Sequence, residues 1–336
     1  MKCYICLTAP HDDNDVYVST LEATLVSARK NTSLEIVALY DGSEDSECYK
    51  LLKLFEVEII KHEFSHKSYL DKIYPNEHIK RNVKKEDFYH KLSGTFMRLD
   101  IPFVEKEEKY VLYVDIDVIF LKDIVLADLP KPKFLAAAPE FDKNVSKMKY
   151  FNAGVLLLNI EGMKEKCRQI FSKMEKCTPT NKGLFDQGYL NEFCFKDMEL
   201  LPLIYNWKPY WGINDEAVII HFHGMKPLGN NESSGFGMND SSLISTLSGH
   251  TQDINGYVFY LSKYFDLLSK DGDLWLSNFI SHIFYLFNDR KENSEFEKQK
   301  QKYKKKIKKI KKMSFLFNIL IIGCFLSLYL FNLIGT

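Results

Sequence analysis

Two aspartates, Asp115 and Asp117, stand one residue apart directly after the apolar stretch 110–114. In extended backbone, residues i and i+2 face the same way, so the two carboxylates can converge on one point. Like charges held that close repel one another unless a cation lies between them. Carboxylate oxygens suit hard ions such as Mg²⁺ or Mn²⁺, so the pair predicts a divalent metal site. The plainer alternative is that the two aspartates only cap a following helix.

The two standard glycine-rich phosphate-binding loops are missing from the sequence. No G-x-G-x-x-G follows the first apolar run, and G-x-x-x-x-G-K-[ST] occurs nowhere. If the chain binds a nucleotide, its phosphate charge must be neutralised in another way. A metal at Asp115 and Asp117 would provide that charge.

Further polar clusters stand at the ends of apolar runs or before them. Taken singly, each has a bland alternative as a turn residue, a surface charge or a core histidine. The clusters are Ala-Pro-His-Asp-Asp-Asn at 9–14, Arg98, Tyr-Phe-Asn-Ala-Gly at 150–154, Asp186-Gln187, and Ile-Ile-His-Phe-His-Gly-Met-Lys-Pro at 219–227.

Together and in this order, the motifs resemble glycosyltransferase family 8. They are Asp-Asp-Asn at 12–14, Arg98, Asp-Ile-Asp at 115–117, Phe-Asn-Ala-Gly-Val-Leu-Leu-Leu-Asn at 151–159, Asp186-Gln187 and His-Phe-His-Gly-Met-Lys-Pro at 221–227. The resemblance covers residues 2–228. It implies a GT-A-type, Rossmann-like fold and retaining, metal-dependent transfer of a hexose from a UDP-sugar. Galactose and glucose are the implied sugars, and the acceptor stays unknown, with a glycolipid as one candidate.

The resemblance also implies roles for single residues. Asp115, Asp117 and His221 would bind Mn²⁺ (or Mg²⁺), and Arg98 would tie the sugar to the two carboxylates. The implied contacts to the nucleotide sugar are Asp12, Asn14, Ile116, Asn152, Ala153, Gly154, Gly224 and Lys226. Asp186 and Gln187 fall where the group that acts on the sugar centre is expected, whether covalently or only electrostatically.

Two alternatives for the function remain open at this stage. An apolar run followed by Asp-x-Asp also resembles the haloacid-dehalogenase phosphatases, in which Asp115 would be the nucleophile. Those enzymes need a downstream Gly-Asp-x-x-x-Asp, and here Gly272-Asp273 is followed by Ser277 in the last position. The second alternative is a non-catalytic relative that binds a sugar nucleotide without cleaving it.

The elements that must position these residues follow from the spacing of apolar side chains. Their β-α-β-α order predicts a mixed, mostly parallel sheet with helices on both faces, which binds ligands at the carboxyl ends of its strands. The predicted strands are 2–8, 34–40, 57–60, 110–114, 134–138 and 155–159, and the predicted helices are 16–30 and 47–55. A loop-rich and helical appendage is expected over 229–297, after a catalytic domain at 1–228.

Charge and cysteine content exclude several other functions. The chain has 45 basic and 45 acidic residues, but ten lysines and no acid lie within 298–312. The rest of the chain therefore carries an excess of acids, which argues against a nucleic-acid partner. Seven cysteines at irregular spacing give no zinc pattern, and Cys3 and Cys6 would face opposite sides of one strand.

The polybasic segment 298–312 precedes 22 uncharged residues at 313–334. A helix of that length covers the roughly 30 Å hydrocarbon core of a bilayer, and flanking lysines favour the cytoplasmic side and anionic lipid headgroups. The sequence therefore predicts a single-pass C-terminal membrane anchor that contacts membrane lipid, with the catalytic body on the cytoplasmic side. The alternative is a buried terminal helix beside a solvated run of charge.

Overall fold

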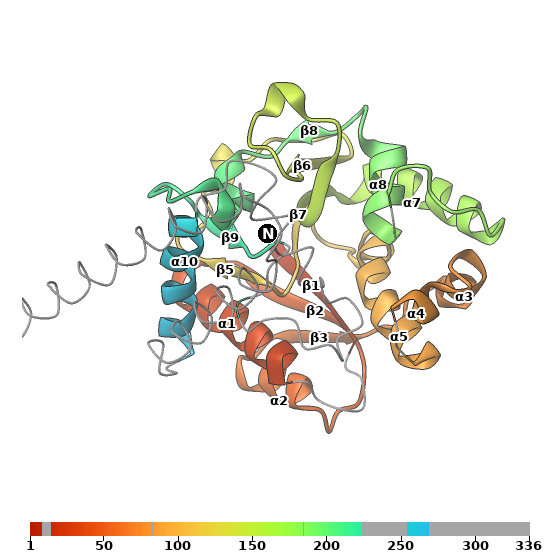
Figure 1. Cartoon of the computed structure of the whole chain (residues 1–336), viewed down its shortest axis with the longest axis horizontal. Coiled ribbons are helices and arrows are strands. Elements are labelled where there is room, and N and C mark those ends of the chain that lie inside the picture. The colour runs from red at the N-terminus through yellow and green to blue at the C-terminus, as the bar shows by residue number, and fades with distance from the viewer. Residues whose placement is uncertain (9–14, 82–83, 184, 224–226, 228–253, 269–336) are drawn as a thin grey trace, which may run out of the picture. The chain divides into compact units, whose positions relative to one another are not determined.

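The computed structural model describes residues 1–8, 15–81, 84–183, 185–223, 227 and 254–268 (Figure 1). The chain divides into two compact units, 1–277 and 278–336, and every described residue belongs to the first. The predicted polybasic segment 298–312 and the predicted anchor 313–334 lie outside the described residues, as does most of the predicted appendage. Among the helices that the structure describes, none is both long and apolar enough to cross a membrane.

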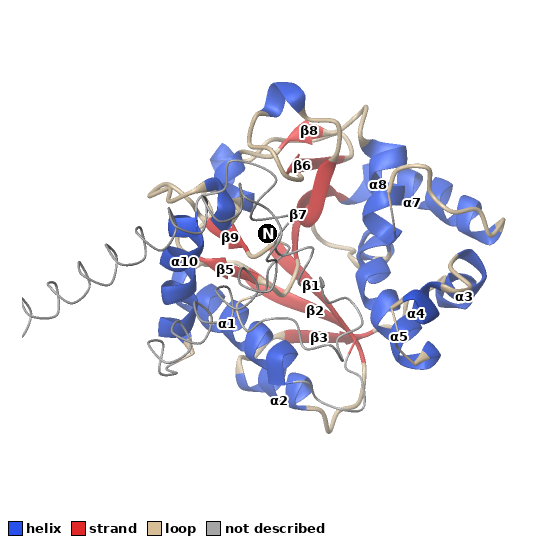
Figure 2. Ribbon diagram, viewed as in Figure 1, coloured by secondary structure: helices blue, strands red, loops and turns tan. Residues whose placement is uncertain are grey.

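A seven-stranded sheet forms the centre of the described unit (Figure 2). Its strand order is β3-β2-β1-β4-β7-β6-β8. The strands are β1 (Lys2–Thr8), β2 (Glu35–Asp41), β3 (Glu58–Lys61), β4 (Tyr110–Val114), β6 (Leu135–Pro139), β7 (Phe151–Asn159) and β8 (Glu199–Leu200). A separate pair is made by β5 (Val118–Phe120) and β9 (Ile219–His221), which run antiparallel.

Only β7 runs against the other strands of this sheet. It pairs antiparallel with both of its neighbours, β4 and β6, whereas the remaining four pairings are parallel. The predicted mixed, mostly parallel sheet is therefore confirmed. Because β1 to β4 are parallel, their carboxyl ends all meet at one edge of the sheet, and Asp115 follows β4 at that edge.

Helices cover both faces of the sheet, as predicted (Figure 1). On one face α1 (Asp15–Asn31) and α2 (Glu47–Leu54) bury apolar side chains such as Leu25 and Leu52. On the other face α5 (Lys85–Phe96), α7 (Ile160–Glu175) and α8 (Phe185–Cys194) bury Phe88, Met163 and Leu190. Cys3 and Cys6 lie in opposite core clusters, because strand residues an odd number apart face opposite ways.

The other α-helices among the described residues are short or lie late in the chain. They are α3 (Leu70–Ile73), α4 (Glu77–Lys80), α6 (Ile101–Val104) and α10 (Ile254–Leu267). Helix α10 packs on the body through three tyrosines. The hydroxyls of Tyr264, Tyr260 and Tyr257 donate to the carbonyls of Ser19 at 3.1 Å, Asn214 at 3.2 Å and His223 at 3.4 Å.

One boundary differs from the prediction in a way that bears on function. Strand β7 begins at Phe151, four residues before the predicted start at 155. A register shift in β6 between Ala137 and Ala138 lets Asn152 pair with Ala138, and the Asn191 side chain bonds both backbone groups of Phe151. Residues 151–154, which the sequence analysis places before the strand, therefore lie within it.

Candidate functional site

The aspartate pair occupies the short link between β4 and β5. The Asp115 backbone N–H donates to the Gly154 carbonyl at 2.7 Å, which fixes the link against β7. On the other side, the Thr24 hydroxyl of α1 lies 2.5 Å from the Ile116 carbonyl oxygen and 2.8 Å from that of Val118. The link is therefore held from both sides, and Ile116 takes part through its backbone.

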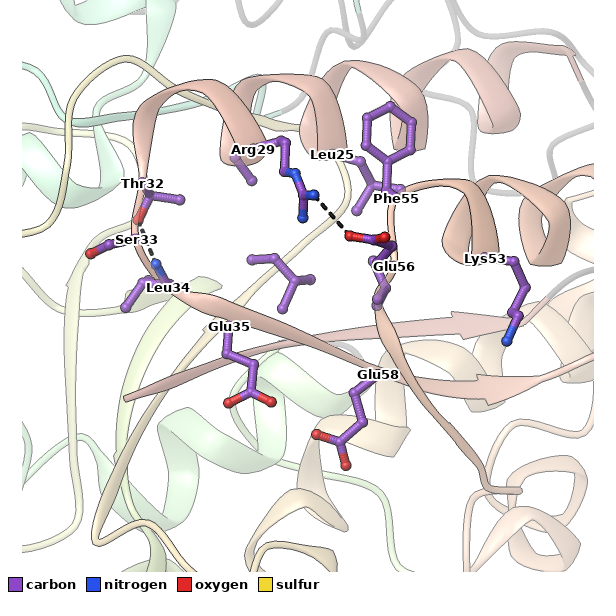
Figure 3. Close-up of a pocket in the computed structure, with 13 residues that line it drawn as sticks. Leu25, Arg29, Thr32, Ser33, Leu34, Glu35, Lys53, Phe55, Glu56 and Glu58 are labelled. Carbon is purple, nitrogen blue, oxygen red and sulfur yellow. Dashed lines mark hydrogen bonds and ion pairs between the residues drawn. The ribbon is translucent and has the colours of Figure 1, made fainter.

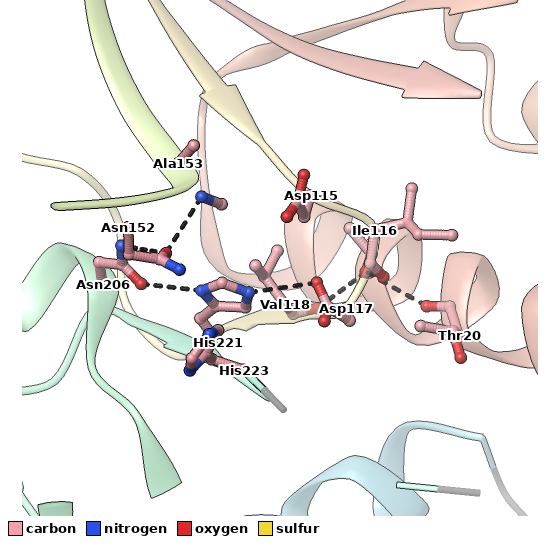
Figure 4. Close-up of polar contacts among 12 residues, drawn as sticks. Thr20, Asp115, Ile116, Asp117, Val118, Asn152, Ala153, Asn206, His221 and His223 are labelled. Atoms are coloured by element: carbon pink, nitrogen blue, oxygen red, sulfur yellow. Dashed lines mark hydrogen bonds and ion pairs between the residues drawn. The ribbon is translucent and has the colours of Figure 1, made fainter. Parts of the chain in front are cut away.

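Strand β9 brings His221 to this link from about a hundred residues further along the chain. Val118 pairs with His221 in the antiparallel β5–β9 ladder, and the Phe222 N–H donates to the Asp117 carbonyl at 2.9 Å. The His221 Nε2 atom lies 3.4 Å from Asp117 Oδ1 (Figure 4). Asp115, Asp117 and His221 each offer a ligand atom, and these atoms lie within 4.8 Å of one another.

The chemistry of these three groups fits a divalent metal ion. Burial lowers the pKa of His221 to about 3, so its imidazole is neutral at physiological pH, as a metal ligand must be. Two carboxylates with one imidazole suit Mn²⁺. Gly154 leaves the required room, because a Cβ there would lie 2.1 Å from His221 Cε1 and 2.9 Å from Asp115 Oδ2.

Arg98 joins the aspartate link to α8. It lies in the short helix η2 (Met97–Leu99), where its Nη2 is 2.9 Å from Asp115 Oδ1 and its Nε is 3.0 Å from Asp186 Oδ2. Its Nη1 donates to the Ala153 carbonyl, and the guanidinium stacks over the Tyr113 ring at 4.4 Å. Burial raises the pKa of Asp186, and Asp115 adds to that effect while Arg98 opposes it.

We expect Arg98→Met to lower the free energy of unfolding by about 3 kcal/mol, because it leaves buried Asp186 without its opposite charge. Urea titration measures the change. The double variant Arg98→Met/Asp186→Asn should recover part of the loss. A double variant no more stable than Arg98→Met alone would show that the ion pair does not account for the effect.

The sugar-pocket residues predicted from the sequence lie on β7 and α8. The Ala153 N–H donates to Gln187 Oε1 at 2.7 Å, so the Gln187 amide is anchored to β7. The Gly154 N–H donates to Asn152 Oδ1 at 3.0 Å. The predicted residues that lie next to the link between β4 and β5 are therefore Asp186, Gln187, Asn152, Ala153 and Gly154. The other predicted contacts to the nucleotide sugar, Asp12, Asn14, Gly224 and Lys226, lie outside the described residues.

A buried carboxylate that no motif predicts, Glu140, lies beside this site. Glu140 Oε1 lies 3.0 Å from His223 Nε2, and Glu140 Oε2 accepts from Asn152 Nδ2 at 2.9 Å. Burial favours the neutral form of Glu140, but the His223 charge and hydrogen bonds from His223, Asn152 and Gln187 lower its pKa to about 2. No sequence signal marks Glu140, because it lies outside every motif and is brought here by the pairing of β6 with β7.

Because of the Glu140 carboxyl, the free energy of unfolding should depend on pH in the acid range. The unfolded chain takes up this proton near its ordinary pKa of 4.5, whereas the folded chain holds it off until about 2. The stabilisation, on the order of 3 kcal/mol, is therefore complete above pH 4.5 and disappears as the pH falls towards 2.

Urea unfolding of the wild type and Glu140→Gln between pH 6 and pH 3 tests this expectation. The stability gap between the two proteins should narrow as the pH falls. Asp142→Asn is the matched control, because Asp142 is exposed and should leave a small gap at every pH. A gap for Glu140→Gln that is constant with pH would contradict the expectation.

A cavity of about 590 Å³ lies elsewhere in the described unit (Figure 3). It is lined by Glu35 and Glu58, the first residues of β2 and β3, and by the ion pair of Arg29 with Glu56 at 2.9 Å. These are the amino ends of the parallel strands, whereas Asp115 follows a carboxyl end. The cavity is therefore separate from the metal-binding candidates.

Comparisons with known proteins cover the larger part of the chain. Residues 12–231, about two thirds of the chain, match the model of the family described as glycosyl transferase family 8. A comparison with curated proteins gives no match.

The solved structures that this chain resembles include three transferases. Mouse xyloside xylosyltransferase 1 in its apo form is 15% identical, with a TM-score of 0.44, over 66% of this chain and 96% of that one. The apo form of the glycosyltransferase GlyE of Streptococcus pneumoniae TIGR4 is 19% identical, with a TM-score of 0.49, over 84% of this chain and 64% of that one. The galactosyltransferase LgtC, in complex with donor and acceptor sugar analogues, is 16% identical, with a TM-score of 0.44, over 75% of this chain and 97% of that one.

Proposed function

The chain belongs to glycosyltransferase family 8, and we propose that it is a retaining, metal-dependent enzyme that transfers a hexose from a UDP-sugar to an acceptor hydroxyl. Galactose and glucose are the proposed sugars. Family membership favours this role of the aspartate link over the phosphatase alternative. The acceptor is a glycan, a glycolipid or a protein, and its identity is left to experiment.

One observation carries the metal-dependent part of this proposal. Asp115 and Asp117 lie in the link between β4 and β5, and His221 lies in β9 about a hundred residues later. Their ligand atoms nevertheless lie within 4.8 Å of one another. In the proposal these three side chains hold Mn²⁺ or Mg²⁺, and a bound ion supplies positive charge that stabilises the departing diphosphate. The positive charge is needed because neither glycine-rich phosphate loop occurs in the sequence.

Arg98, Asp186 and Gln187 are the proposed catalytic residues on the sugar side. Arg98 holds Asp115 and Asp186 in fixed positions through two charged contacts. We assign to the Asp186 carboxylate and the Gln187 amide oxygen an electrostatic role, in which they stabilise positive charge that develops at the sugar C1.

The proposed reaction is a substitution at C1 of the donor sugar. The bond from C1 to the diphosphate oxygen breaks, and the acceptor oxygen bonds to C1 on the same face of the ring. The proton of the acceptor hydroxyl passes to the departing diphosphate. UDP and a glycosylated acceptor are the products.

The direct test is to incubate the full chain with Mn²⁺ and a panel of nucleotide sugars and to measure release of nucleoside diphosphate. We expect UDP from UDP-galactose or UDP-glucose, and no release with EDTA. If a donor binds but is not cleaved with any acceptor tried, the result would instead support the non-catalytic alternative. Hydrolysis of a generic phosphate ester by Asp115 in place of sugar transfer would contradict the assignment.

From the sequence alone, we also propose that 298–312 and 313–334 anchor the enzyme to a membrane with its catalytic body on the cytoplasmic side. Fractionation of the full chain and of a chain truncated after Glu297 tests the proposal. The full chain should sediment with membranes and the truncated chain should not. Equal partition of both proteins would refute the anchor.

A further inference from the structure

Three buried polar side chains form a chain of hydrogen bonds that ends at His221. Glu140, Asn152 and Asn206 are 8%, 2% and 0% exposed. Glu140 directly follows β6, Asn152 lies in β7 and Asn206 ends the short helix η5 (Leu203–Asn206). Buried amides are costly unless each donor meets an acceptor, so the direction of every hydrogen bond in this group carries information.

The direction of the Asn152 amide is fixed from both of its ends. The Gly154 backbone N–H can only donate, and it lies 3.0 Å from one end of the Asn152 amide, which must therefore be Oδ1. The other end lies 2.9 Å from Glu140 Oε2. An ionised carboxylate can only accept, so this end must be the Nδ2 donor.

The same logic fixes Asn206 and then His221. The Asn206 atom that lies 3.0 Å from Asn152 Oδ1 must be the donor Nδ2. Its other amide atom is therefore the acceptor Oδ1, and it lies 3.0 Å from His221 Nδ1 (Figure 4). An acceptor at that distance requires the proton of the neutral imidazole to sit on Nδ1.

We propose that Glu140, Asn152 and Asn206 form a directed hydrogen-bond relay that sets the tautomer of His221, leaving the Nε2 lone pair for the metal ion. All three are positioning residues, because they act through His221. The inference deepens the proposed function and rests on the metal role assigned there. With the proton on Nδ1, the Nε2 lone pair and Asp117 Oδ1 are two acceptors 3.4 Å apart, an arrangement that a bound cation would stabilise.

Two measurements without a sugar substrate test the relay. The first is ¹⁵N NMR of the histidine ring in metal-free protein, with the His221 signals identified by their loss in His221→Gln. We expect Nδ1 to carry the proton and Nε2 to carry the lone pair. A His221 ring with its proton on Nε2 would overturn the relay, and this readout needs no relay variant to fold.

The second measurement is Mn²⁺ affinity from the EPR signal of the free ion. Asn206→Leu removes both hydrogen bonds and should weaken Mn²⁺ binding about 10- to 100-fold. Asn206→Asp keeps an acceptor for Nδ1–H, so its affinity should stay closer to the wild type even if its stability falls. Asn159→Leu is the control, since Asn159 is the amide at the far end of β7 that caps α7; it should lose stability but keep wild-type affinity.

The outcomes separate the relay from the proposed function. Wild-type affinity in Asn206→Leu, or an equal loss in Asn159→Leu, would overturn the relay while leaving metal binding intact. If the wild type binds no Mn²⁺, the metal role fails, and the ring tautomer in the metal-free protein still decides whether the relay exists.

Discussion

Replacing Asp117 with asparagine is expected to reduce UDP release by at least about a hundredfold, equivalent to about 3 kcal/mol of transition-state stabilisation. The substitution keeps the size of the side chain and removes one of the two negative charges that face His221. Asp117 is the sharper choice of the two aspartates. Asp115 also binds Arg98 and Tyr113, so its replacement would disturb the Arg98–Asp186 pair as well.

The measurement is the initial rate of UDP release at a saturating donor concentration across a range of Mn²⁺ concentrations. Asp128→Asn is the matched control, because Asp128 is an exposed aspartate outside the site. The control should keep the wild-type rate and the wild-type metal dependence. Turnover by Asp117→Asn at the wild-type rate would mean that this carboxylate does not serve the reaction.

Replacing Gly154 with alanine is expected to weaken Mn²⁺ binding at least tenfold and to reduce turnover with it. The added Cβ would stand 2.1 Å from His221 Cε1 and 2.7 Å from its Nε2. The imidazole is buried and held by Asn206, so it must leave its position to admit the methyl group. The displaced Nε2 could then no longer bind the same metal ion as the two carboxylates.

Gly162→Ala provides a control of the same kind in another part of the fold. Its Cβ would stand 1.9 Å from the Lys133 carbonyl oxygen, at the start of α7. This variant should lower the melting temperature and retain the wild-type Mn²⁺ affinity in the folded protein. If both glycine variants lose stability and neither loses affinity, the close approach of Gly154 to His221 is not what shapes the metal site.

Much of the fold could be read from local patterns of apolar residues. Strands β1 and β4 begin and end where the sequence predicts, because each is an apolar run bounded by polar or turn residues. The start of β7 was missed for a physical reason. Asn152 and Gly154 are poor strand formers. They belong to β7 because Asn152 pairs with Ala138 beyond the register shift, the Gly154 carbonyl accepts from the Asp115 N–H, and Asn191 bonds Phe151.

The site residues also differ in whether local sequence or long-range contacts determine their positions. The spacing of Asp115 and Asp117 is local, so strand geometry alone could predict their convergence, whereas the place of His221 came from the family resemblance. Glu140 and Asn206 could not be found in either way. Both residues act through hydrogen bonds to the Asn152 side chain. No spacing in the sequence predicts these contacts.

Pulsed EPR of the Mn²⁺-loaded protein shows whether Asp115, Asp117 and His221 bind one divalent ion. We expect one bound Mn²⁺ with a single directly coordinated imidazole nitrogen, whose hyperfine coupling changes when histidine is labelled with ¹⁵N and disappears in His221→Gln. Mn²⁺ that binds with no nitrogen coupling, or whose coupling survives in His221→Gln, would rule out this metal site.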